Sequence, residues 1–383
     1  MIDADKHTAP AKKVLFVANT DWYLFNFRLN LLESAREAGL SVQLACPRRD
    51  HASKLSALGY PVHAVPFDTQ GLNPLAELRA LVALARIIRQ TKPDVIHLFT
   101  LKCVLYGCLA SLVGKRTRVV GAITGMGHLF TTRSWRTRLL KTPVLWALKI
   151  ALRGSNAQLI FQNSADRDEF VDHGLIKRER TDVIRGSGVD CKRFQPATRQ
   201  STEGPLSLLF CGRLLAEKGI AEYLSATNEL RASGIDFRSL IAGAPYPGNP
   251  SSLSQTEVEA LRNNARHDYL GHTEDMAPLF AKADVVVLPT YREGTPKALL
   301  EAAASGCIIV TTDIPGCEGI VDPGLNGDLV PIKTVAPLVA ALKQIIQATP
   351  EEREAMSQHS RKIALERFSD VQVNQRTLAV YND

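Results

Sequence analysis

The sequence predicts an α/β protein built from two doubly wound, Rossmann-like domains in series. Three observations support this prediction. The length of 383 residues exceeds what a single hydrophobic core usually supports. Apolar, strand-like runs alternate with amphipathic helical stretches, which is the pattern of a parallel sheet covered on both faces. The alternation starts again after Gly186.

The first half begins with a buried, strand-like run and then alternates regularly. We expect strands at residues 14–18, 41–45, 62–65, 95–98 and 119–123, and helices at residues 27–38, 53–58 and 75–90. Gly, Asp and Pro interrupt the pattern at residues 188–196, so we place the first domain at residues 1–190.

The second half repeats this order. Strands are expected at residues 206–211, 237–242, 285–288 and 307–311, with a short strand ending at Leu270, and helices at residues 220–233, 254–264, 297–304 and 335–348. We place the second domain at residues 191–365, followed by a C-terminal helix at residues 366–383.

The composition is that of a globular protein, with 45% hydrophobic and 22% charged residues. No apolar stretch approaches the roughly 18 residues of a membrane span. Residues 1–13 are polar, so we do not expect a secretory signal there. The seven cysteines are scattered without a C-x-x-C pair, which favours a reducing cytoplasm over a zinc site or disulfides.

The positive charge is unevenly distributed. The net charge is +7, but no acidic residue lies between Asp94 and Asp166, where ten Lys or Arg occur. The first domain should therefore attract a negatively charged partner. Nucleic acid, anionic lipid and phosphorylated substrates all fit this charge.

A first candidate site follows the strand at residues 206–211. Gly212 permits a sharp turn, and the side chains of Arg213 and Lys218 can reach above the strand end. A guanidinium and an amine suit the two phosphates of a diphosphate. A solvated charged loop is the alternative interpretation.

A second candidate site follows the strand at residues 285–288. We expect Thr295 to cap the next helix, Pro296 to occupy its first turn and Gly306 to end it. The turn at Gly294 would then present backbone N–H groups and a positive helix end to an anion. Two carboxylates, Glu293 before the helix and Glu301 within it, suit sugar or ribose hydroxyls; surface charges are the alternative.

These two motifs together resemble the family-4 retaining glycosyltransferases of the GT-B type. The E-x7-E pattern of Glu293 and Glu301 accompanies Gly212-Arg213-Leu214 and Glu217-Lys218-Gly219. Further matches extend along nearly the whole chain: Asp94-Val95-Ile96-His97, Gly186-Ser187-Gly188-Val189-Asp190, Phe194-Gln195-Pro196, Tyr269-Leu270-Gly271, Gly316-Cys317-Glu318-Gly319 and Asn326-Gly327.

The resemblance implies a role for each matched residue. Arg213 and Lys218 would hold the donor diphosphate, Glu293 the transferred sugar and Glu301 the ribose. The distal phosphate would be held by the backbone at Gly294, Thr295, Pro296 and Lys297. The base would lie against the Leu270-Gly271 loop. The family transfers sugar with front-face attack and retention. The Asp-x-Asp formed by Asp3 and Asp5 lies in the polar segment before the first strand, so we expect neither a metal nor another cofactor.

In the first domain, residues 19–28 resemble the branch of the family that builds capsular and lipid-linked glycans. We expect acceptor contacts from Asn19, Trp22, Tyr23 and Arg28, and from Gly125 in a later loop, with aromatic rings stacked on sugar faces. A packing cluster at the start of a helix is an equally good interpretation. This domain is therefore the expected acceptor domain and the second the donor domain.

Another loop follows the strand at residues 119–123. Many relatives have a catalytic His immediately before the Gly that is Gly125 here, but this chain has Thr124. Thr124 itself or His128 could take that role. His97 is interpreted as a packing histidine at a strand end.

Residues 133–153 combine aromatic and aliphatic side chains with many cations. The membrane-facing candidates are Arg133, Trp135, Arg136, Arg138, Lys141, Trp146 and Lys149. Such a helix can lie in a bilayer interface, where each Lys or Arg adds about 1 kcal/mol on an anionic leaflet. A domain-covering helix with a basic rim is the alternative. We expect a peripheral protein on the cytoplasmic face of the inner membrane.

The function predicted from these features is transfer of a hexose or N-acetylhexosamine from a nucleotide sugar, with UDP-GalNAc or UDP-GlcNAc favoured, to a polyprenyl diphosphate-linked saccharide. One alternative is a sugar-nucleotide epimerase or hydrolase of the same architecture, although a hydrolase needs two carboxylates at set distances. A basic nucleic-acid-binding protein is another, but no binding module accompanies the charge, so nucleic acid is not an expected partner. An inactive binding module is a third.

Overall fold

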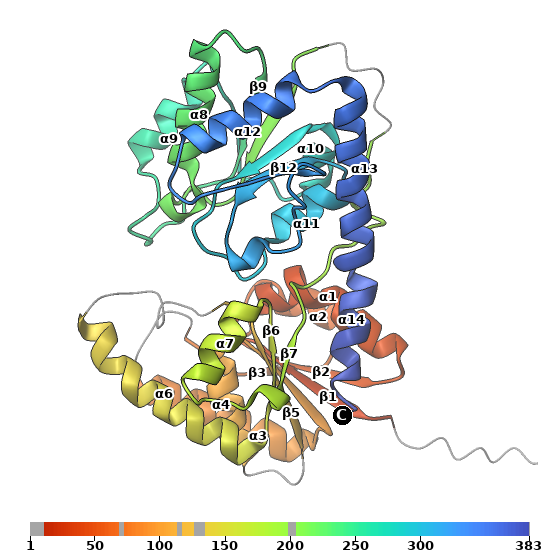
Figure 1. Ribbon diagram of the computed structural model, residues 1–383. Coiled ribbons are helices and arrows are strands. Elements are labelled where there is room, and N and C mark those ends of the chain that lie inside the picture. Colours follow the sequence, from red (N-terminus) through yellow and green to blue (C-terminus); the bar gives the residue numbers. More distant parts are fainter. Residues whose placement is uncertain (1–10, 69–72, 113–116, 126–134, 198–203, 383) are drawn as a thin grey trace, which may run out of the picture. The chain divides into compact units, whose positions relative to one another are not determined.

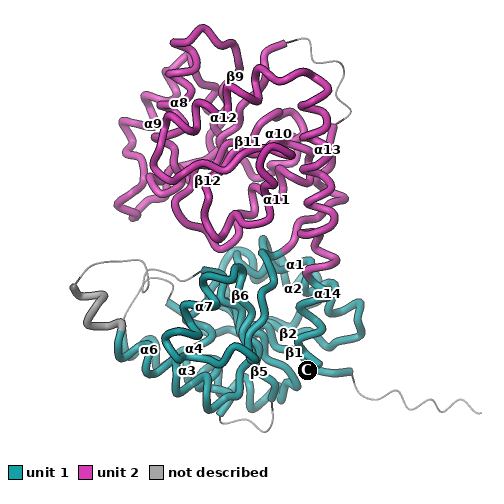
Figure 2. The backbone as a smooth tube through the Cα atoms, in the orientation of Figure 1, with its two compact units in different colours: residues 1–187, 374–383 teal, residues 188–373 magenta. Residues whose placement is uncertain are grey.

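The computed structural model describes residues 11–68, 73–112, 117–125, 135–197 and 204–382, with the side chains of residues 135–141 outside the description. The chain divides into two compact units (Figures 1 and 2). Unit 1 comprises residues 1–187 and 374–383, and unit 2 comprises residues 188–373. The expected boundaries were residues 190/191 and 365/366.

Unit 1 is a seven-stranded parallel sheet with helices on its faces. Its strands are β1 (Lys13–Val17), β2 (Ser41–Cys46), β3 (Val62–Ala64), β4 (Val95–Phe99), β5 (Arg118–Ile123), β6 (Gln158–Phe161) and β7 (Thr181–Val183). Its helices are α1 (Asp21–Glu37), α2 (Ala52–Ala57), α3 (Pro74–Thr91), α4 (Leu101–Ser111), α6 (Trp135–Ser155) and α7 (Ser164–Asp172), with a 3-10 turn η1 (Arg178–Arg180). The strand order is β3-β2-β1-β4-β5-β6-β7, so the winding direction reverses between β1 and β4.

Unit 2 is a six-stranded parallel sheet of the same design. Its strands are β8 (Ser207–Cys211), β9 (Arg238–Ala242), β10 (Asp268–Gly271), β11 (Val285–Leu288), β12 (Ile308–Thr312) and β13 (Gly327–Val330). Its helices are α8 (Ile220–Ala232), α9 (Gln255–Arg262), α10 (Ala277–Lys282), α11 (Lys297–Ala304), α12 (Ala336–Gln347) and α13 (Pro350–Arg367), with 3-10 turns η2 (Ala216–Lys218) and η3 (Pro315–Cys317). The order β10-β9-β8-β11-β12-β13 reverses between β8 and β11.

The last helix, α14 (Asp370–Ala379), starts in unit 2 and ends in unit 1. Residues that follow it are fixed to unit 1. The Lys12 Nζ donates to the Tyr381 carbonyl at 2.9 Å, and the Arg118 Nε donates to the Val380 carbonyl at 2.8 Å. The chain end therefore contributes to the structure of the first unit.

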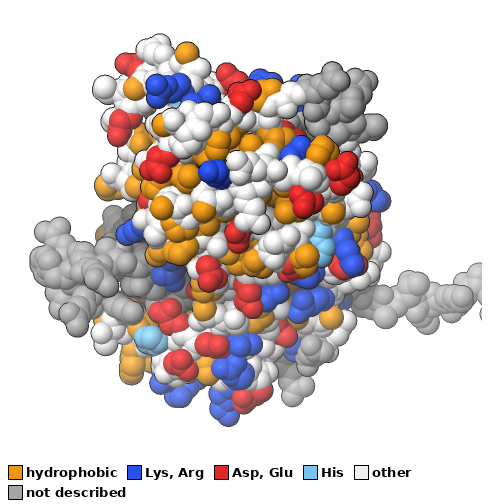
Figure 3. Space-filling view, turned by 45° about the horizontal axis from the view of Figure 1, so that its top comes forward, with side chains coloured by type: hydrophobic (Ala, Val, Ile, Leu, Met, Phe, Trp, Pro, Cys, Tyr) orange, Lys and Arg blue, Asp and Glu red, His pale blue; other side chains and the backbone are white. Residues whose placement is uncertain are grey.

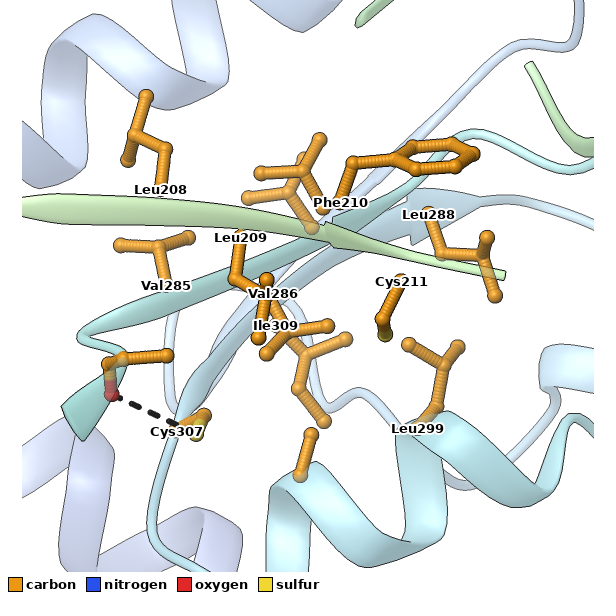
Figure 4. Close-up of a cluster of buried hydrophobic side chains, with 14 of the residues drawn as sticks. Leu208, Leu209, Phe210, Cys211, Val285, Val286, Leu288, Leu299, Cys307 and Ile309 are labelled. Carbon is orange, nitrogen blue, oxygen red and sulfur yellow. Dashed lines mark hydrogen bonds between the residues drawn. The ribbon is translucent and has the colours of Figure 1, made fainter. Parts of the chain in front are cut away.

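The sheet of unit 2 lies at the centre of that unit's hydrophobic core because its strand residues are apolar. Strands β8, β11 and β12 are buried along their whole length, as expected when helices cover both faces. Figure 4 shows their side chains packed together with Leu299 of α11, and the Cys307 thiol donates to the Phe280 carbonyl at 3.2 Å. This packing fixes the carboxyl ends of β8 and β11 beside each other.

One predicted boundary is wrong. Helix α1 begins at Asp21, six residues before the expected start at residue 27. The Thr20 hydroxyl accepts a hydrogen bond from the Tyr23 N–H at 3.1 Å, and the Asp21 carboxylate accepts one from the Trp22 N–H at 2.9 Å. These two side chains satisfy N–H groups at the helix start, so residues 21–28 are helical rather than a loop.

Candidate active site

The candidate donor residues lie in loops at the carboxyl ends of the strands of unit 2. The loop at residues 212–219 follows β8, and the loop at residues 289–296 follows β11. β8 and β11 are neighbours at the point where the winding reverses. In doubly wound sheets this is where ligands bind, because the loops on the two sides diverge there.

A glycine lets the two loops pack against each other. Gly219 has a positive φ of 76°, and a Cβ at this position would lie 2.2 Å from the Pro289 carbonyl oxygen. Backbone hydrogen bonds join the same loops: the Tyr291 N–H donates to the Glu217 carbonyl at 2.8 Å, and the Thr290 hydroxyl donates to it at 3.1 Å. The loop after β8 is thus held directly on the loop after β11.

This packing brings together Lys218 and Glu293, which the sequence placed in separate motifs. Their side chains form an ion pair, and both are only 15% exposed. The Thr290 hydroxyl also donates to the Glu293 carboxylate at 3.3 Å. An amine and a carboxylate at the switch point of one sheet form a polar site that can contact a phosphate and a hydroxyl side by side.

Arg213 lies at the same strand end but is more exposed. Its guanidinium lies over the Tyr246 ring, with the Cζ 5.1 Å from the ring centroid. Tyr246 was not singled out from the sequence, because it lies in a separate loop after β9. A cation resting on an exposed aromatic ring keeps its hydrogen-bond donors at the edge of that ring.

The start of α11 differs from the expectation. The cap position is held by Pro296, which is extended at φ −72° and ψ 107°, and the helix begins at Lys297. The expectation that Thr295 caps the helix is therefore wrong; the Thr295 hydroxyl donates instead to the Gly294 carbonyl at 3.0 Å. No side chain caps the helix, and its positive end is suited to an anion.

The second glutamate of the motif is inside the protein. Glu301 is buried, and its carboxylate lies 3.4 Å from the Lys297 Nζ one turn earlier in α11. Burial raises the pKa of Glu301, while Lys297 lowers it by a smaller amount. Each glutamate of the E-x7-E pattern is thus paired with a lysine, and neither pairing follows from the spacing of the glutamates.

Glycines join the ends of β8, β9 and β10 next to Arg213. The Gly212 N–H donates to the Ala242 carbonyl at 3.0 Å, and the Gly243 N–H donates to the Gly271 carbonyl at 2.7 Å. A Cβ on Gly243 would lie 1.8 Å from the Gly212 carbonyl oxygen, so only glycine fits there. Gly212 and Gly271 were predicted from the sequence and Gly243 was not, although its position directly after a buried strand was the available signal. Leu270, beside Gly271, is exposed.

The candidate acceptor residues lie at the switch point of unit 1. Arg28 is buried; its Nε and Nη2 donate to the Tyr23 hydroxyl at 2.9 and 2.7 Å, and its Cζ lies 4.7 Å from the Phe99 centroid. Trp22 is half-exposed and packs on Phe27, with 5.2 Å between ring centroids. The packing interpretation therefore applies to Tyr23 and Arg28, and Trp22 is the accessible ring. Asn19 lies before α1 and is half-buried.

Asp21 organises this region and was missed from the sequence. It is buried, and one carboxylate oxygen accepts hydrogen bonds from the backbone N–H groups of Arg49, His51 and Ala52 at 3.0, 2.9 and 2.9 Å. The only sign of this role in the sequence was an acidic residue directly after Thr20, the residue that caps α1. Asp21 fixes the loop after β2 and the start of α2 against α1.

Thr124 and Gly125 close the described part of the loop after β5. Gly125 has a positive φ of 134°. Thr124 borders a small cavity together with Arg28 and His97. His128, the other candidate for the catalytic role, lies outside the described residues.

The candidate membrane residues are only partly described. Arg133 lies outside the described residues, and the side chains of Trp135, Arg136, Arg138 and Lys141 are not described either. Trp146 is 68% exposed on α6, and Lys149 is half-buried. Within the described ranges, every helix is too short or too polar to cross a bilayer.

The described residues contain no group of three or more His, Cys, Asp or Glu side chains that could hold a metal ion. All seven cysteines are free. Burial raises the pKa of the Cys46 thiol to about 12 and that of the Cys108 thiol to about 11. These thiols are therefore packing residues.

Two family models match this chain. "Glycosyl transferases group 1" matches residues 192–363, and "Glycosyl transferase 4-like" matches residues 13–164. Together they cover most of both units.

Two relatives and one solved structure illustrate the similarity. The N,N'-diacetylbacillosaminyl-diphospho-undecaprenol α-1,3-N-acetylgalactosaminyltransferase of Campylobacter jejuni is 26% identical over 82% of this chain and 84% of its own length. The UDP-Gal:α-D-GlcNAc-diphosphoundecaprenol α-1,3-galactosyltransferase of Escherichia coli is 23% identical over 73% of each chain. Anabaena HepE in complex with UDP and glucose has a TM-score of 0.75 at 19% identity, covering 97% of this chain and 100% of that one. The predicted fold class, two doubly wound Rossmann-like units of the GT-B type, is confirmed.

Proposed function

Because the chain belongs to the family-4, group 1 glycosyltransferases, we propose that it transfers a hexose or N-acetylhexosamine, with retention, from a UDP-sugar to a polyprenyl diphosphate-linked saccharide. The names of the relatives from C. jejuni and E. coli supply the acceptor class and, in the second, the UDP carrier. UDP-GalNAc and UDP-GlcNAc are the donors we would test first.

The observation that carries this proposal is the contact between Lys218 and Glu293 at the switch point of unit 2. A UDP-sugar presents a diphosphate and a ring of hydroxyls next to each other, and this pair offers a cation and a carboxylate at one place. In the proposed complex Lys218 turns from Glu293 to the diphosphate. Glu293 then accepts hydrogen bonds from the transferred sugar.

The remaining donor contacts follow from the same loops. Arg213 would hold the diphosphate from the other side, and the backbone from Gly294 to Lys297 would meet the distal phosphate at the positive end of α11. Glu301 would accept from the ribose hydroxyls after exchanging its contact with Lys297. The base would lie against Leu270 and Gly271.

The reaction proposed here needs positioning and charge stabilisation. As the bond between the anomeric carbon and the diphosphate oxygen breaks, the sugar becomes oxocarbenium-like and negative charge grows on the departing phosphate. Lys218, Arg213 and the α11 N–H groups stabilise that charge. The acceptor hydroxyl attacks from the same face, and its proton passes to the departing phosphate oxygen, so UDP leaves protonated. In unit 1, Thr124 would take the role that a His has in many members of the family. We propose no metal and no further cofactor.

The decisive experiment removes both cations. We expect R213Q/K218Q to lower kcat/KM for transfer from UDP-GalNAc or UDP-GlcNAc by about 10³-fold or more, since each charged donor is worth about 10²-fold or more in such sites. K343Q, an exposed lysine on α12, is the matched control and should behave like wild type. Wild-type activity of the double variant, or loss of wild-type activity with a chelator, would contradict the proposal.

We also propose that unit 1 contacts an anionic membrane, on the cytoplasmic face of the inner membrane. The structure adds a second helix to the one expected from the sequence. On α3, Leu75, Leu78 and Val82 are 67%, 56% and 39% exposed at i, i+3 and i+7 spacing. Arg79, Arg86 and Arg89 are exposed beside them.

The α3 stripe and the exposed part of α6 belong to one helical layer. Both helices pack against α4 (Figure 1), and Ile150 is exposed one turn after Trp146 on α6. An apolar stripe beside arginines suits an anionic lipid surface. A second copy of the chain would set like charges against each other. On the face seen in Figure 3, acidic and basic side chains are interspersed, which gives no continuous surface for nucleic acid.

Vesicle sedimentation tests the membrane contact. We expect binding to phosphatidylglycerol vesicles, little binding to phosphatidylcholine vesicles or duplex DNA, and loss of binding at high salt. L75S/L78S/V82S and W146S/I150S should each weaken binding about fivefold or more, since each removes buried apolar area. L325S/I332S, which changes two exposed residues of unit 2, is the matched control. Equal binding to both vesicle types would contradict the contact.

A further inference from the structure

His97 of β4 has one ring nitrogen with a partner and one without. The residue is 1% exposed and packs against the rings of Phe99 and Phe16. Its Nδ1 is 2.6 Å from the Tyr381 hydroxyl oxygen. Its Nε2 is buried and has no hydrogen-bond partner among the described residues. Leaving a polar atom unpaired in a protein interior is unfavourable, so simple packing does not account for the unpaired nitrogen.

His97 is one of the residues that line a small cavity of unit 1. Its volume is about 10 Å³, close to what one water molecule requires. Its polar lining comes from three strands or strand ends, β4, β5 and β6, and from helices α1 and α14: His97, Thr124, Gln162, Arg28 and Thr377. A water molecule needs two to four polar partners, and this lining offers them.

We propose that His97 is a positioning residue, whose Nε2 is joined through one bound water molecule to Thr124 and Arg28. The water completes the hydrogen bonding of His97 and fixes the Thr124 hydroxyl at the carboxyl end of β5. Because Thr124 is the residue proposed for the catalytic role in unit 1, this inference rests on the proposed function. It replaces the interpretation of His97 as a packing histidine.

Chemistry at the ring supports a fixed, neutral imidazole. Burial lowers the pKa of His97 well below its usual value, and the nearby Arg28 cation lowers it further. A neutral ring has one N–H. Whether Tyr381 donates to Nδ1 or accepts from it, a water molecule can supply the complementary role at Nε2.

The partner on the other nitrogen comes from the far end of the sequence. Tyr381 is buried, and its segment is held by Lys12 and Arg118 through the hydrogen bonds described above. The C-terminal residues therefore fix the orientation of His97. Tyr381 is in this way linked to Thr124 through His97 and the proposed water molecule.

A matched control exists in unit 2. His267, just before β10, is buried, its Nδ1 lies 2.8 Å from the Ser239 Oγ, and its Nε2 also lacks a partner among the described residues. It lies near the amino ends of the strands, away from the candidate active site. H267F should therefore lower stability without a specific effect on turnover.

The test is a double-mutant cycle with stability measured in parallel. For transfer from UDP-GalNAc to undecaprenyl diphosphate-linked GlcNAc, we expect H97F and T124V each to lower kcat about tenfold, equivalent to about 1.4 kcal/mol in the barrier. The double variant should lose little more than either single one, because both changes remove the same network. H267F should lower the unfolding midpoint and leave kcat near wild type.

Y381F keeps the aromatic ring and removes only the hydroxyl, so it tests the network if H97F does not fold. We expect a severalfold lower kcat with little change in KM for the donor. Additive losses in the double variant, or wild-type kcat in both H97F and Y381F, would overturn the inference while the proposed function stands. If no nucleotide sugar is transferred, the proposed function fails. A high-resolution crystal structure still tests the inference: a water on His97 Nε2 supports it, and a dry cavity overturns it.

Discussion

At the scale of single residues, the candidate donor site consists of two pairs of opposite charge. Lys218 pairs with Glu293, and Lys297 pairs with Glu301. In each pair the carboxylate is mostly buried, so it depends on its lysine for compensation. A donor with phosphates and hydroxyls can take over both kinds of contact, and we propose that each glutamate contacts a different part of it.

This difference predicts separate kinetic effects. We expect E293Q to lower kcat about 10²-fold or more without raising KM for the UDP-sugar, because it removes a contact to the reacting sugar and frees Lys218 for phosphate. E301Q should raise KM about tenfold, because it removes one charged hydrogen bond to the ribose, and it should change kcat little. Steady-state kinetics check this, with E229Q on the exposed side of α8 as the control. The reverse pattern would contradict the assignment.

Gly219 provides a second prediction at this scale. Gly219 and Gly234 have nearly the same φ, 76° and 75°, but a Cβ on Gly234 has nothing within 4 Å. We expect G234A to cost about 1 kcal/mol of unfolding free energy for the positive φ. G219A should cost about 2 kcal/mol more, since its Cβ would overlap the Pro289 carbonyl. Urea unfolding measures both, and equal losses would show that the loops do not need this close approach.

At the scale of elements, most helices and strands start and end where local chemistry directs. Helices α9 and α13 each have a capping box, from Ser254 with Glu257 and from Thr349 with Glu352. The sequence pattern mispredicted how α1 and α11 begin, for opposite reasons. Thr20 caps a helix that the apolar pattern placed later, and Thr295 does not cap one although its residue type favours that role.

Helix α13 is held by an ionic contact that gives a pH prediction. The Asp322 carboxylate accepts from both terminal nitrogens of Arg367 at 2.9 Å and lies 3.0 Å from the His359 Nε2. These contacts, Arg367 first, lower the pKa of Asp322 from 3.8 to about 2. Because the folded-state pKa is the lower one, the stabilisation is fully present above pH 4 and is lost as the pH falls toward 2.

We therefore expect D322N to lose about 1–2 kcal/mol of unfolding free energy at pH 7, allowing for partial exposure of the pair. The difference between D322N and wild type should shrink as the pH falls from about 4 to about 2, where the wild-type carboxylate becomes protonated. Urea unfolding across this pH range is the measurement. A difference that stays constant with pH would mean that the carboxylate charge is not responsible.

At the scale of the whole molecule, the two units repeat one architecture with different roles. In unit 2 the candidate residues Arg213, Lys218 and Glu293 follow β8 and β11, the strands at which the winding reverses. In unit 1 the candidates at residues 19–28 follow β1, and Thr124 follows β5. The C-terminal segment adds Tyr381 to the first unit. Ligand binding should therefore stabilise the units separately.

UDP alone should act on unit 2. At 100 times its Kd, a ligand that binds only the folded state adds about 2.7 kcal/mol of stability. We expect UDP to slow amide hydrogen exchange in the loops at residues 212–219 and 289–296 and at the start of α11, measured by mass spectrometry. Residues 19–28 should be unaffected, which makes them the internal control. Protection confined to unit 1 would contradict the donor assignment.

The sequence by itself determined the fold class, the family and the two donor motifs. Parallel strands buried on both faces require continuous apolar runs, and each loop carries its Gly, Lys and Glu residues in a local pattern, so short windows of sequence were sufficient. The tertiary structure alone decided which of these residues meet. Lys218 contacts Glu293, Asp21 holds residues 49–52, and Tyr381 contacts His97 across 284 positions. Such pairings depend on the strand order of each sheet and on the close approach of loops, and neither is written in any local stretch of the chain.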